Sequence, residues 1–223
     1  MYKYTAIIVE PRRHKALRFV LENFFSNLSD EWGFILFHGT LNMDYIMNIL
    51  DNELPQYRHR VIKLVNMGVD NLTLGDYSTL FKTPQLYEHI DTEMFLIFQT
   101  DTMILPKHKE LIHRFMKYDY VGAPWRDRIV GNGGLSLRRK SKMVEICHKV
   151  HPSVCEPEDV WFCYQTAVEL SRPTFEEARL FSIETMFHDY SFGIHAPWKH
   201  FSKPLMNYLI QKNPDIATLM SLQ

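Results

Sequence analysis

The chain has 223 residues, a hydrophobic content of 46%, a charged content of 23% and a formal net charge of −1. This length suits one α/β domain and leaves little for a second. The balanced charge argues against a nucleic-acid partner or an anionic membrane surface. No apolar run approaches the roughly 20 residues that cross a bilayer, so no membrane span is expected.

The N-terminal half alternates between strand-like and helix-like patterns. Residues 4–9 form a β-branched apolar run, and residues 15–28 carry apolar side chains at helical spacing. A second strand is expected at 34–37, a helix from Asn42 or Asp44 to Leu50, and a third strand at 60–65. This β-α-β-α-β order predicts a mostly parallel sheet with helices on both faces.

The middle of the chain begins with a polar, turn-rich stretch at 70–81, for which no regular element is expected. A short helix is expected at 84–90, because Pro84 suits a first helical turn. A buried strand starts at Met94. A helix is then expected over 106–118 and a short strand over 119–121.

The C-terminal third contains the densest glycine cluster, at residues 131–134. Helices are expected at 141–150 and 160–170, and a short strand is expected to end at Ile183. Residues 138–140, Arg-Arg-Lys, are interpreted as a solvated helix start and not as a nucleic-acid patch. Residues 204–223 are expected to form a peripheral helix. Because no repeat or linker is visible, residues 1–223 are assigned to a single domain.

Cysteine usage and the N-terminus bear on location. Cys147, Cys155 and Cys163 are odd in number and include no C-x-x-C pair, so they are expected to be reduced, mostly buried thiols. The apolar start of the chain soon meets Pro11 and lacks the longer apolar region of a signal peptide. Both observations favour a cytoplasmic location.

Asp101 stands where the buried strand that starts at Met94 should end. In open α/β sheets, ligands bind outside the carboxyl ends of the strands. A carboxylate there can hold a hard cation, which in turn can hold a phosphate. The alternative is that Asp101 caps the next turn or pairs with an arginine.

Three other charged points stand at expected strand or loop ends: Arg12-Arg13, Glu158-Asp159 and His195. With Asp101, they make the set that a metal-dependent enzyme acting on a diphosphate requires: an anchoring carboxylate, an imidazole, a cationic partner and a base. A P-loop, a G-x-G-x-x-G fingerprint and a G-x-S-x-G elbow are all absent from the sequence.

Six sequence blocks occur in one order: LIFQTD (96–101), YDYVGAPW (118–125), GNGGLSLR (131–138), PEDVWF (157–162), FSIE (181–184) and FGIHAPW (192–198). With these blocks the chain resembles a glycosyltransferase-like family of the DUF5672 type. More distantly, it is similar to glycosyltransferases with the A-type fold. The resemblance covers nearly the whole chain and implies an α/β fold with a Rossmann-like central sheet.

The resemblance also implies roles for individual residues. A-type transferases carry a D-x-D-like motif that holds a divalent cation on the nucleotide diphosphate. The matching segment here is 99–101, in which Gln99 replaces the first acid and only Asp101 keeps a carboxylate. A late histidine often completes such a metal site, which makes His195 the second expected ligand. The nucleotide sugar is expected to contact Pro11, Arg12, Gln99, Asp101, Gly133 and Gly134.

By the same resemblance, Asp159 is the expected catalytic base and Glu158 is its neighbour. The plainer interpretation is that both acids simply favour the positive end of a helix dipole. Likewise, His195 could be an ordinary core histidine, and the glycines at 131–134 could be only a turn between strands.

The function expected from the sequence is therefore transfer of a hexose from a nucleotide sugar to a hydroxyl acceptor. The donor is expected to be a UDP sugar, the cation Mn²⁺ or Mg²⁺, and the acceptor a glycan, a protein or a small molecule. Inversion at the anomeric carbon is expected, because a single base suffices for direct displacement. Two alternatives stay open: an inactive nucleotide-sugar or glycan binding module, and a nucleotidyl transferase, which the lack of a basic glycine-rich loop after the first strand disfavours.

Overall fold

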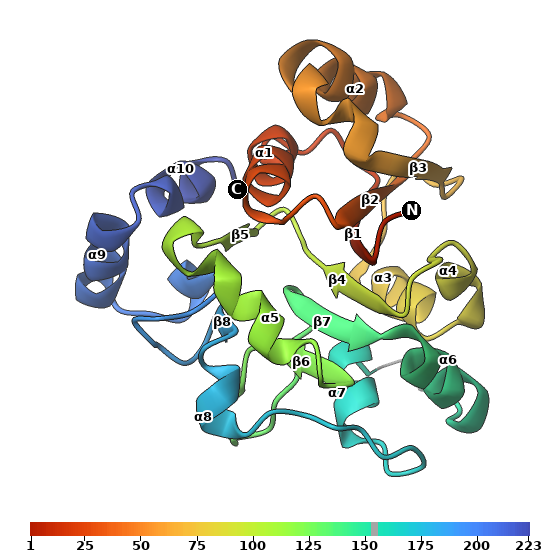
Figure 1. Cartoon of the computed structure of the whole chain (residues 1–223), viewed down its shortest axis with the longest axis vertical. Coiled ribbons are helices and arrows are strands. Elements are labelled where there is room, and N and C mark those ends of the chain that lie inside the picture. The colour runs from red at the N-terminus through yellow and green to blue at the C-terminus, as the bar shows by residue number, and fades with distance from the viewer. Residues whose placement is uncertain (153–155) are drawn as a thin grey trace.

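A computed structural model describes residues 1–152 and 156–223. A six-stranded sheet lies at its centre, with the strand order β3-β2-β1-β4-β7-β6 (Figure 1). Its strands are β1 (Tyr4–Glu10), β2 (Trp32–His38), β3 (Val61–Asn66), β4 (Met94–Ile97), β6 (Tyr120–Gly122) and β7 (Ser136–Arg139).

The direction of the strands confirms the predicted mostly parallel sheet. Strands β3, β2, β1 and β4 run parallel, as the alternation of strands and helices predicts. Strand β7 is antiparallel to both of its neighbours, β4 and β6. No strand at 136–139 was expected, because this segment is short and carries adjacent arginines.

Both faces of the sheet are buried. Along the strands, Ile8, Leu36 and Leu96 belong to one apolar cluster, and their neighbours Ile7 and Phe95 belong to another. Since successive side chains of a strand point to opposite faces, the continuous apolar runs give each face its own core.

The helices divide between these two cores. The first core contains apolar residues of α1 (Leu17–Asn27) and of α2 (Met43–Asn48), which continues into a π-helical turn at Ile49–Glu53 and a 3₁₀ helix at Pro55–Arg60. Phe24 of α1 stacks on Phe98 with ring centroids 4.0 Å apart. The second core contains apolar residues of α3 (Leu74–Phe81), α4 (Pro84–Glu88), α6 (Lys140–Lys149) and α7 (Glu158–Tyr164).

Helix α3 corrects the expectation that residues 70–81 are irregular. The Thr73 hydroxyl accepts from the Asp76 amide, and the Asp76 carboxylate accepts from the Thr73 amide, which makes a reciprocal capping box. Two otherwise unsatisfied donors are thus paired at the start of a short helix.

Three other helices differ from their expected bounds. The segment expected as one helix over 106–118 is a 3₁₀ helix, Pro106–Leu111, followed by α5, Ile112–Phe115. Helix α7 ends at Tyr164 because Gln165 is extended, and its side chain bonds Val168. The C-terminal tail forms two helices, α9 (Lys203–Lys212) and α10 (Asp215–Ser221), with Pro214 at the break.

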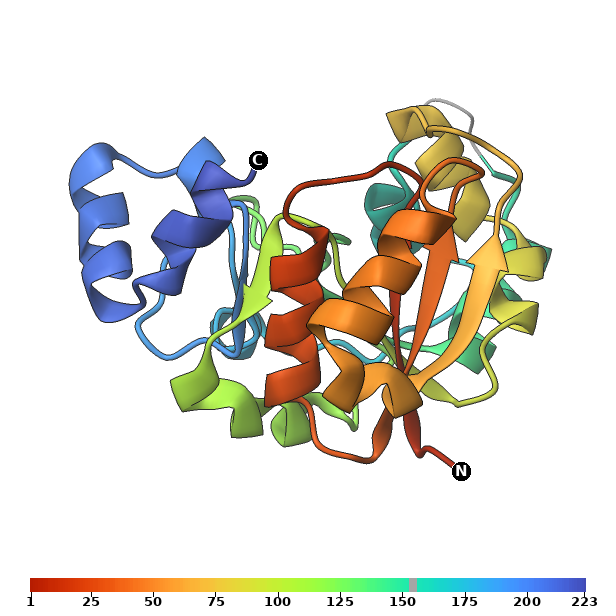
Figure 2. The ribbon, with the colours of Figure 1, turned by 90° about the horizontal axis from the view of Figure 1, so that it is seen from above.

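A second, three-stranded sheet has the order β5-β9-β8, with β5 at Thr102–Ile104, β8 at Ser182–Ile183 and β9 at Gly193–His195. Helix α8 (Phe175–Ala178) precedes β8. The antiparallel register pairs Thr102 with His195. The late histidine is therefore brought beside the segment that follows β4, while α9 and α10 lie at the end of the molecule far from β3 (Figure 2).

Two further expectations concern thiols and membranes. Cys147 and Cys163 are free thiols, half-buried and buried respectively, as expected. The expectation for Cys155 lies outside the described residues. Within residues 1–152 and 156–223, no helix has the length and apolar character to cross a membrane.

Candidate functional site

Two adjoining cavities open where β1 and β4 end. The first has a volume of about 400 Å³ and is lined by the residues after β1 and by Asp101. The second, of about 380 Å³, is lined by the glycine loop, the start of α7 and His195. Leu74, Tyr77 and Gln99 line both cavities, so the two are neighbours that share one wall.

Arg12 stands on the wall of the first cavity and is oriented by Glu10. The Glu10 carboxylate accepts from the Arg12 amide at 2.9 Å and from two atoms of its guanidinium at 2.8 Å each. The Asn42 side chain donates to the carbonyls of both residues and fixes the turn at Pro11. The hydrogen bond to Glu10 raises the pKa of Arg12. The cavity therefore has a fixed but half-exposed cation, and Pro11 lies beside it.

Asp101 is engaged by two groups from one late segment. Its Oδ2 atom lies 2.9 Å from Lys199 Nζ, and its Oδ1 atom lies 3.4 Å from His195 Nε2. Burial raises the pKa of Asp101, but His195 and Lys199 lower it more strongly, to well below the usual range. Between these two partners, Ala196 has a left-handed φ of 41° and a 3₁₀ turn follows, which lets both side chains reach one carboxylate. Sequence reasoning missed Lys199.

His195 also faces Glu184, a second residue that sequence reasoning missed although the FSIE block contains it. Its Nδ1 atom lies 3.3 Å from Glu184 Oε1, which accepts from Asn132 Nδ2 at 2.8 Å. Burial lowers the pKa of His195, but the carboxylates of Asp101 and Glu184 together raise it to about 9. With this pKa, His195 is protonated at neutral pH and lies as a cation between the carboxylates of Asp101 and Glu184.

Gly134 is needed where it packs against His195. A Cβ atom at this position would overlap the imidazole ring. The Gly134 amide also donates to Asn132 Oδ1 at 3.0 Å, so the glycine loop and the Asn132–Glu184 pair confine His195 from two sides. The loop is therefore more than a turn between strands.

The residues present can be tested against the divalent cation that the A-type fold implies. Among the described residues, no group of three or more His, Cys, Asp or Glu side chains could hold a metal ion. Asp101 and His195 offer two adjacent donor atoms. Mg²⁺ usually keeps several waters and binds through one or two carboxylates plus substrate phosphates. The donor set therefore fits a cation that arrives with a diphosphate, in which case the imidazole must bind as its neutral form.

Asp159 lies in the first turn of α7, as expected, and faces the second cavity. Its Oδ2 atom accepts from the Gly133 amide at 3.0 Å, and its Oδ1 atom accepts from the Val160 amide at 2.8 Å. Each carboxylate oxygen can accept more than one hydrogen bond. The half-buried Asp159 is thus oriented yet able to accept a further hydrogen bond from a ligand.

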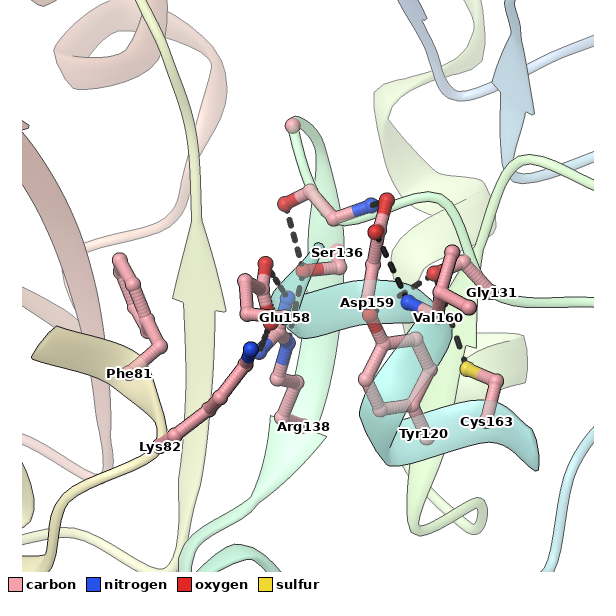
Figure 3. Close-up of polar contacts among 12 residues, drawn as sticks. Phe81, Lys82, Tyr120, Gly131, Ser136, Arg138, Glu158, Asp159, Val160 and Cys163 are labelled. Atoms are coloured by element: carbon pink, nitrogen blue, oxygen red, sulfur yellow. Dashed lines mark hydrogen bonds and ion pairs between the residues drawn. The ribbon is translucent and has the colours of Figure 1, made fainter. Parts of the chain in front are cut away.

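Glu158, its neighbour, lies in a different environment. Only 4% of it is exposed, and its two oxygens accept from Arg138 at 2.7 and 2.8 Å (Figure 3). Burial lowers the pKa of Arg138, but Glu158 raises it more strongly, to well above the usual range. The interpretation of Arg138 as part of a solvated helix start is wrong, because it lies in β7 and is fully buried.

The structure therefore brings most of the expected site residues together. Gln99 lies on the shared wall. The first cavity is lined by Pro11, Arg12 and Asp101, and the second by Gly133, Gly134, Glu158, Asp159 and His195. Because Asp101 and His195 are ion-pair neighbours, the acid of the first cavity lies next to the second.

Comparison with known protein families gives a match for more than half of the chain. A sequence model of a family described as "Protein of unknown function (DUF5672)" matches residues 64–195. No curated protein sequence matches significantly.

Two solved structures show the fold. Residues 1–349 of S. aureus TarS in complex with UDP-GlcNAc are 10% identical to this chain, with a TM-score of 0.54; the match covers 97% of this chain and 66% of that one. The mannosyltransferase PcManGT from Pyrobaculum calidifontis, in complex with GDP-Man and Mn²⁺, is also 10% identical, with a TM-score of 0.52. That match covers 71% of this chain and 50% of the other. The fold is thus the A-type glycosyltransferase fold, although the chain spans only part of both proteins.

Proposed function

The chain belongs to the DUF5672 family, and we propose that it is a metal-dependent glycosyltransferase. It would move a hexose from a nucleotide sugar, most simply a UDP sugar, to the hydroxyl group of a glycan, a protein or a small molecule. The observation that carries the proposal is the pair of adjoining cavities, with Asp101 and its cationic partners on one side and Asp159 on the other. Two adjoining cavities suit a reaction between two substrates, because each cavity can hold one substrate beside the shared wall.

The first cavity would hold the nucleoside diphosphate of the donor. Arg12 and Lys199 are exposed enough to turn toward phosphate oxygens, and both are cations. Asp101 and His195 would hold Mn²⁺ or Mg²⁺. When bound, such a cation neutralises the negative charge that develops on the leaving diphosphate. Arg12 and Lys199 would add to this neutralisation from the protein side.

The second cavity would hold the acceptor. Asp159 would take the proton of the acceptor hydroxyl while that oxygen bonds to the anomeric carbon and the bond from this carbon to the diphosphate oxygen breaks. The bond electrons leave with the diphosphate. A single base suffices for this direct displacement, so the configuration of the anomeric carbon would invert. We expect the reaction to take place in the cytoplasm, where Cys147 and Cys163 would stay reduced.

A second candidate function is a binding module that holds a nucleotide sugar or a glycan without reaction. Gln99 favours it, because this side chain cannot supply the carboxylate that the first position of a D-x-D motif provides. In this case the cavities would bind a donor and release nothing.

The test begins with thermal unfolding of the purified chain in the presence of each nucleoside diphosphate, with and without Mn²⁺. A ligand at 100 times its Kd stabilises the native state by about 2.7 kcal/mol. We expect one nucleotide to stabilise the protein in a metal-dependent way. The sugars of that nucleotide are then assayed for release and transfer. Tight binding with no release or transfer would support the binding module. The absence of nucleotide binding would contradict the transferase and the nucleotide-sugar module, and would leave only a glycan-binding module.

A further inference from the structure

A circuit of buried hydrogen bonds lies beneath Asp159 (Figure 3). Arg138 Nε donates to Ser136 Oγ, Ser136 Oγ donates to the Gly133 carbonyl, and the Gly133 amide donates to Asp159 Oδ2, each at 3.0 Å. The guanidinium of Arg138 also donates two hydrogen bonds to the carboxylate of Glu158, the residue before Asp159. The circuit therefore closes on itself and links β7, the glycine loop and the start of α7.

Three aromatic rings surround the guanidinium of this ion pair, and the buried Lys82 lies near Glu158. The Arg138 guanidinium lies 4.6 Å from the ring centroid of Tyr120, 5.4 Å from that of Phe162 and 5.6 Å from that of Phe81. Burying two charges costs solvation, and well-packed apolar residues of similar volume often stabilise a protein as well or better. Stability alone thus gives weak grounds for an ion pair here. The pair instead contributes geometric specificity, because a bidentate Arg–carboxylate contact fixes the relative orientation of both groups.

Gly133 shows how closely the loop is fitted to this pair. A Cβ atom on Gly133 would overlap Glu158 Oε1 and would lie 3.0 Å from Arg138 Nη2 and 3.1 Å from Asp159 Cβ. Because two hydrogen bonds hold the Glu158 carboxylate, it cannot easily move to make room for a Cβ atom on Gly133. The backbone of the loop therefore rests directly on the ion pair and on Asp159.

We propose that Arg138 and Glu158 are positioning residues that hold the Asp159 carboxylate against the Gly133 amide, in the orientation needed to take a proton from the acceptor. The proposal rests on the proposed function for its catalytic consequence, but the hold on Asp159 can be measured without any substrate. Proton transfer depends on geometry, and a misplacement of about 1 Å can lower a rate about 100-fold.

The first measurement is hydrogen exchange of the Gly133 amide by NMR. Three variants are compared: Ser136→Ala, the double variant Arg138→Met with Glu158→Leu, and Asp159→Ala. The last variant removes the carboxylate that accepts from the Gly133 amide, so its exchange rate is the upper limit. In the first two we expect exchange to quicken about 5-fold or more, toward that limit, because a released carboxylate no longer holds the amide. Amides of β1 should be unchanged. Protection of Gly133 equal to wild type in both variants would overturn the proposal.

Arg139→Met is the matched control. Arg139 is the next residue of the same strand and pairs with Asp119 at 2.7 Å, outside the circuit. We expect it to lower thermal stability modestly and to leave Gly133 exchange unchanged. If Arg139→Met quickens Gly133 exchange as much as the circuit variants do, the effect is general loosening and the proposal fails. Should the double variant not fold, Ser136→Ala, which removes one hydroxyl, decides the question.

The second measurement separates positioning from binding. With the donor and acceptor found for the wild type, we expect the double variant to lose about 10- to 100-fold in kcat while KM for the donor changes little. The thermal midpoint is measured alongside, because the buried Lys82 also loses the nearby Glu158 carboxylate in this variant. An unchanged kcat would contradict positioning. If the wild type itself binds no nucleotide, the proposed function fails, and the exchange result still decides whether the ion pair holds Asp159.

Discussion

The two cavities are built in different ways. In the first, charged groups are paired by neighbours in the chain or at the surface: Arg12 by Glu10, and Lys199, which is 58% exposed, by Asp101. In the second, both members of the ion pair are buried, as Arg138 and Glu158 are. The contrast teaches that the cations of the first cavity keep exposed ends that a ligand can reach, whereas the ion pair of the second cavity is enclosed by the protein.

This difference has an energetic side. Exposed ion pairs contribute little to stability, since solvent screens them and long side chains lose entropy on pairing. Breaking a buried pair leaves an uncompensated charge and is strongly destabilising. Changes in the first cavity should therefore alter binding more than folding, and changes in the second should alter rate or folding.

The largest effect is expected from Asp159→Asn. The amide keeps the shape of the side chain but cannot take a proton, so we expect the transfer rate to fall by about 10²- to 10⁴-fold. The thermal shift caused by the nucleotide should stay as in wild type. Initial rates at saturating donor and Mn²⁺ measure the first quantity. Turnover within about 3-fold of wild type would exclude Asp159 as the base.

Asp101→Asn tests the acid that lies at the boundary between the two cavities. The variant replaces the carboxylate of one of the two proposed cation ligands by a neutral amide and leaves Lys199 next to the site. We expect Mn²⁺ affinity, measured with bound nucleoside diphosphate, to fall by about 10- to 100-fold. Stabilisation by the nucleotide without metal should persist. An unaltered response to Mn²⁺ would show that the cation binds elsewhere. Asp91→Asn, at an exposed pair with Lys63, is the control.

Gly134→Ala tests how rigid the second cavity is. Its new methyl group would overlap the His195 ring, which two acids and the loop confine. Overpacking of this kind costs about 1–3 kcal/mol in the free energy of unfolding. The matched control is Gly75→Ala in α3, where the nearest atom outside the helix backbone lies 3.7 Å away. Alanine favours helix by up to about 1 kcal/mol over glycine. Urea unfolding should give opposite signs, and equal signs would contradict the confinement of His195.

The smallest effect is expected from Arg12→Ala. Because the side chain is half exposed, we expect nucleotide affinity to fall by only about 3- to 10-fold, as for the loss of one charge-assisted hydrogen bond with its partners solvated. The thermal midpoint without ligand should also fall, because the buried Glu10 loses its guanidinium partner. Calorimetric titration measures the affinity. A complete loss of binding would mean that the first cavity is as rigidly built as the second, and the comparison would fail.

Sequence reasoning predicted the parallel half of the fold well, since residues 4–9 and 34–37 lie within β1 and β2. Continuous apolar runs separated by one amphipathic helix leave few other arrangements. It missed α3, although Thr73-x-x-Asp76 is a capping signature that could have found it. The reversed direction of β7 could not be read, because apolar alternation says nothing of strand direction.

The candidate site was likewise predicted only in part. Asp101, Asp159 and His195 stand at element ends with chemistry that marks them, and the structure places them near one another. Arg138 and Glu184 were missed because their importance depends on partners 20 and 11 residues away, Glu158 and His195. An arginine next to Arg139 and Lys140 looks solvated until the strand that buries it is known.

The antiparallel strand β7 has a consequence for how such a protein can diverge. Since β6 and β7 form a hairpin, the loop from 123 to 135 leaves and rejoins the sheet at one edge, and its last residues line the second cavity. The part of the loop before Asn132 can vary without shifting the register of β1, β2 or β4, whereas Gly133 and Gly134 are constrained by their contacts. A change in that part of the hairpin would alter the rim of the second cavity and leave the strands behind the first cavity unchanged.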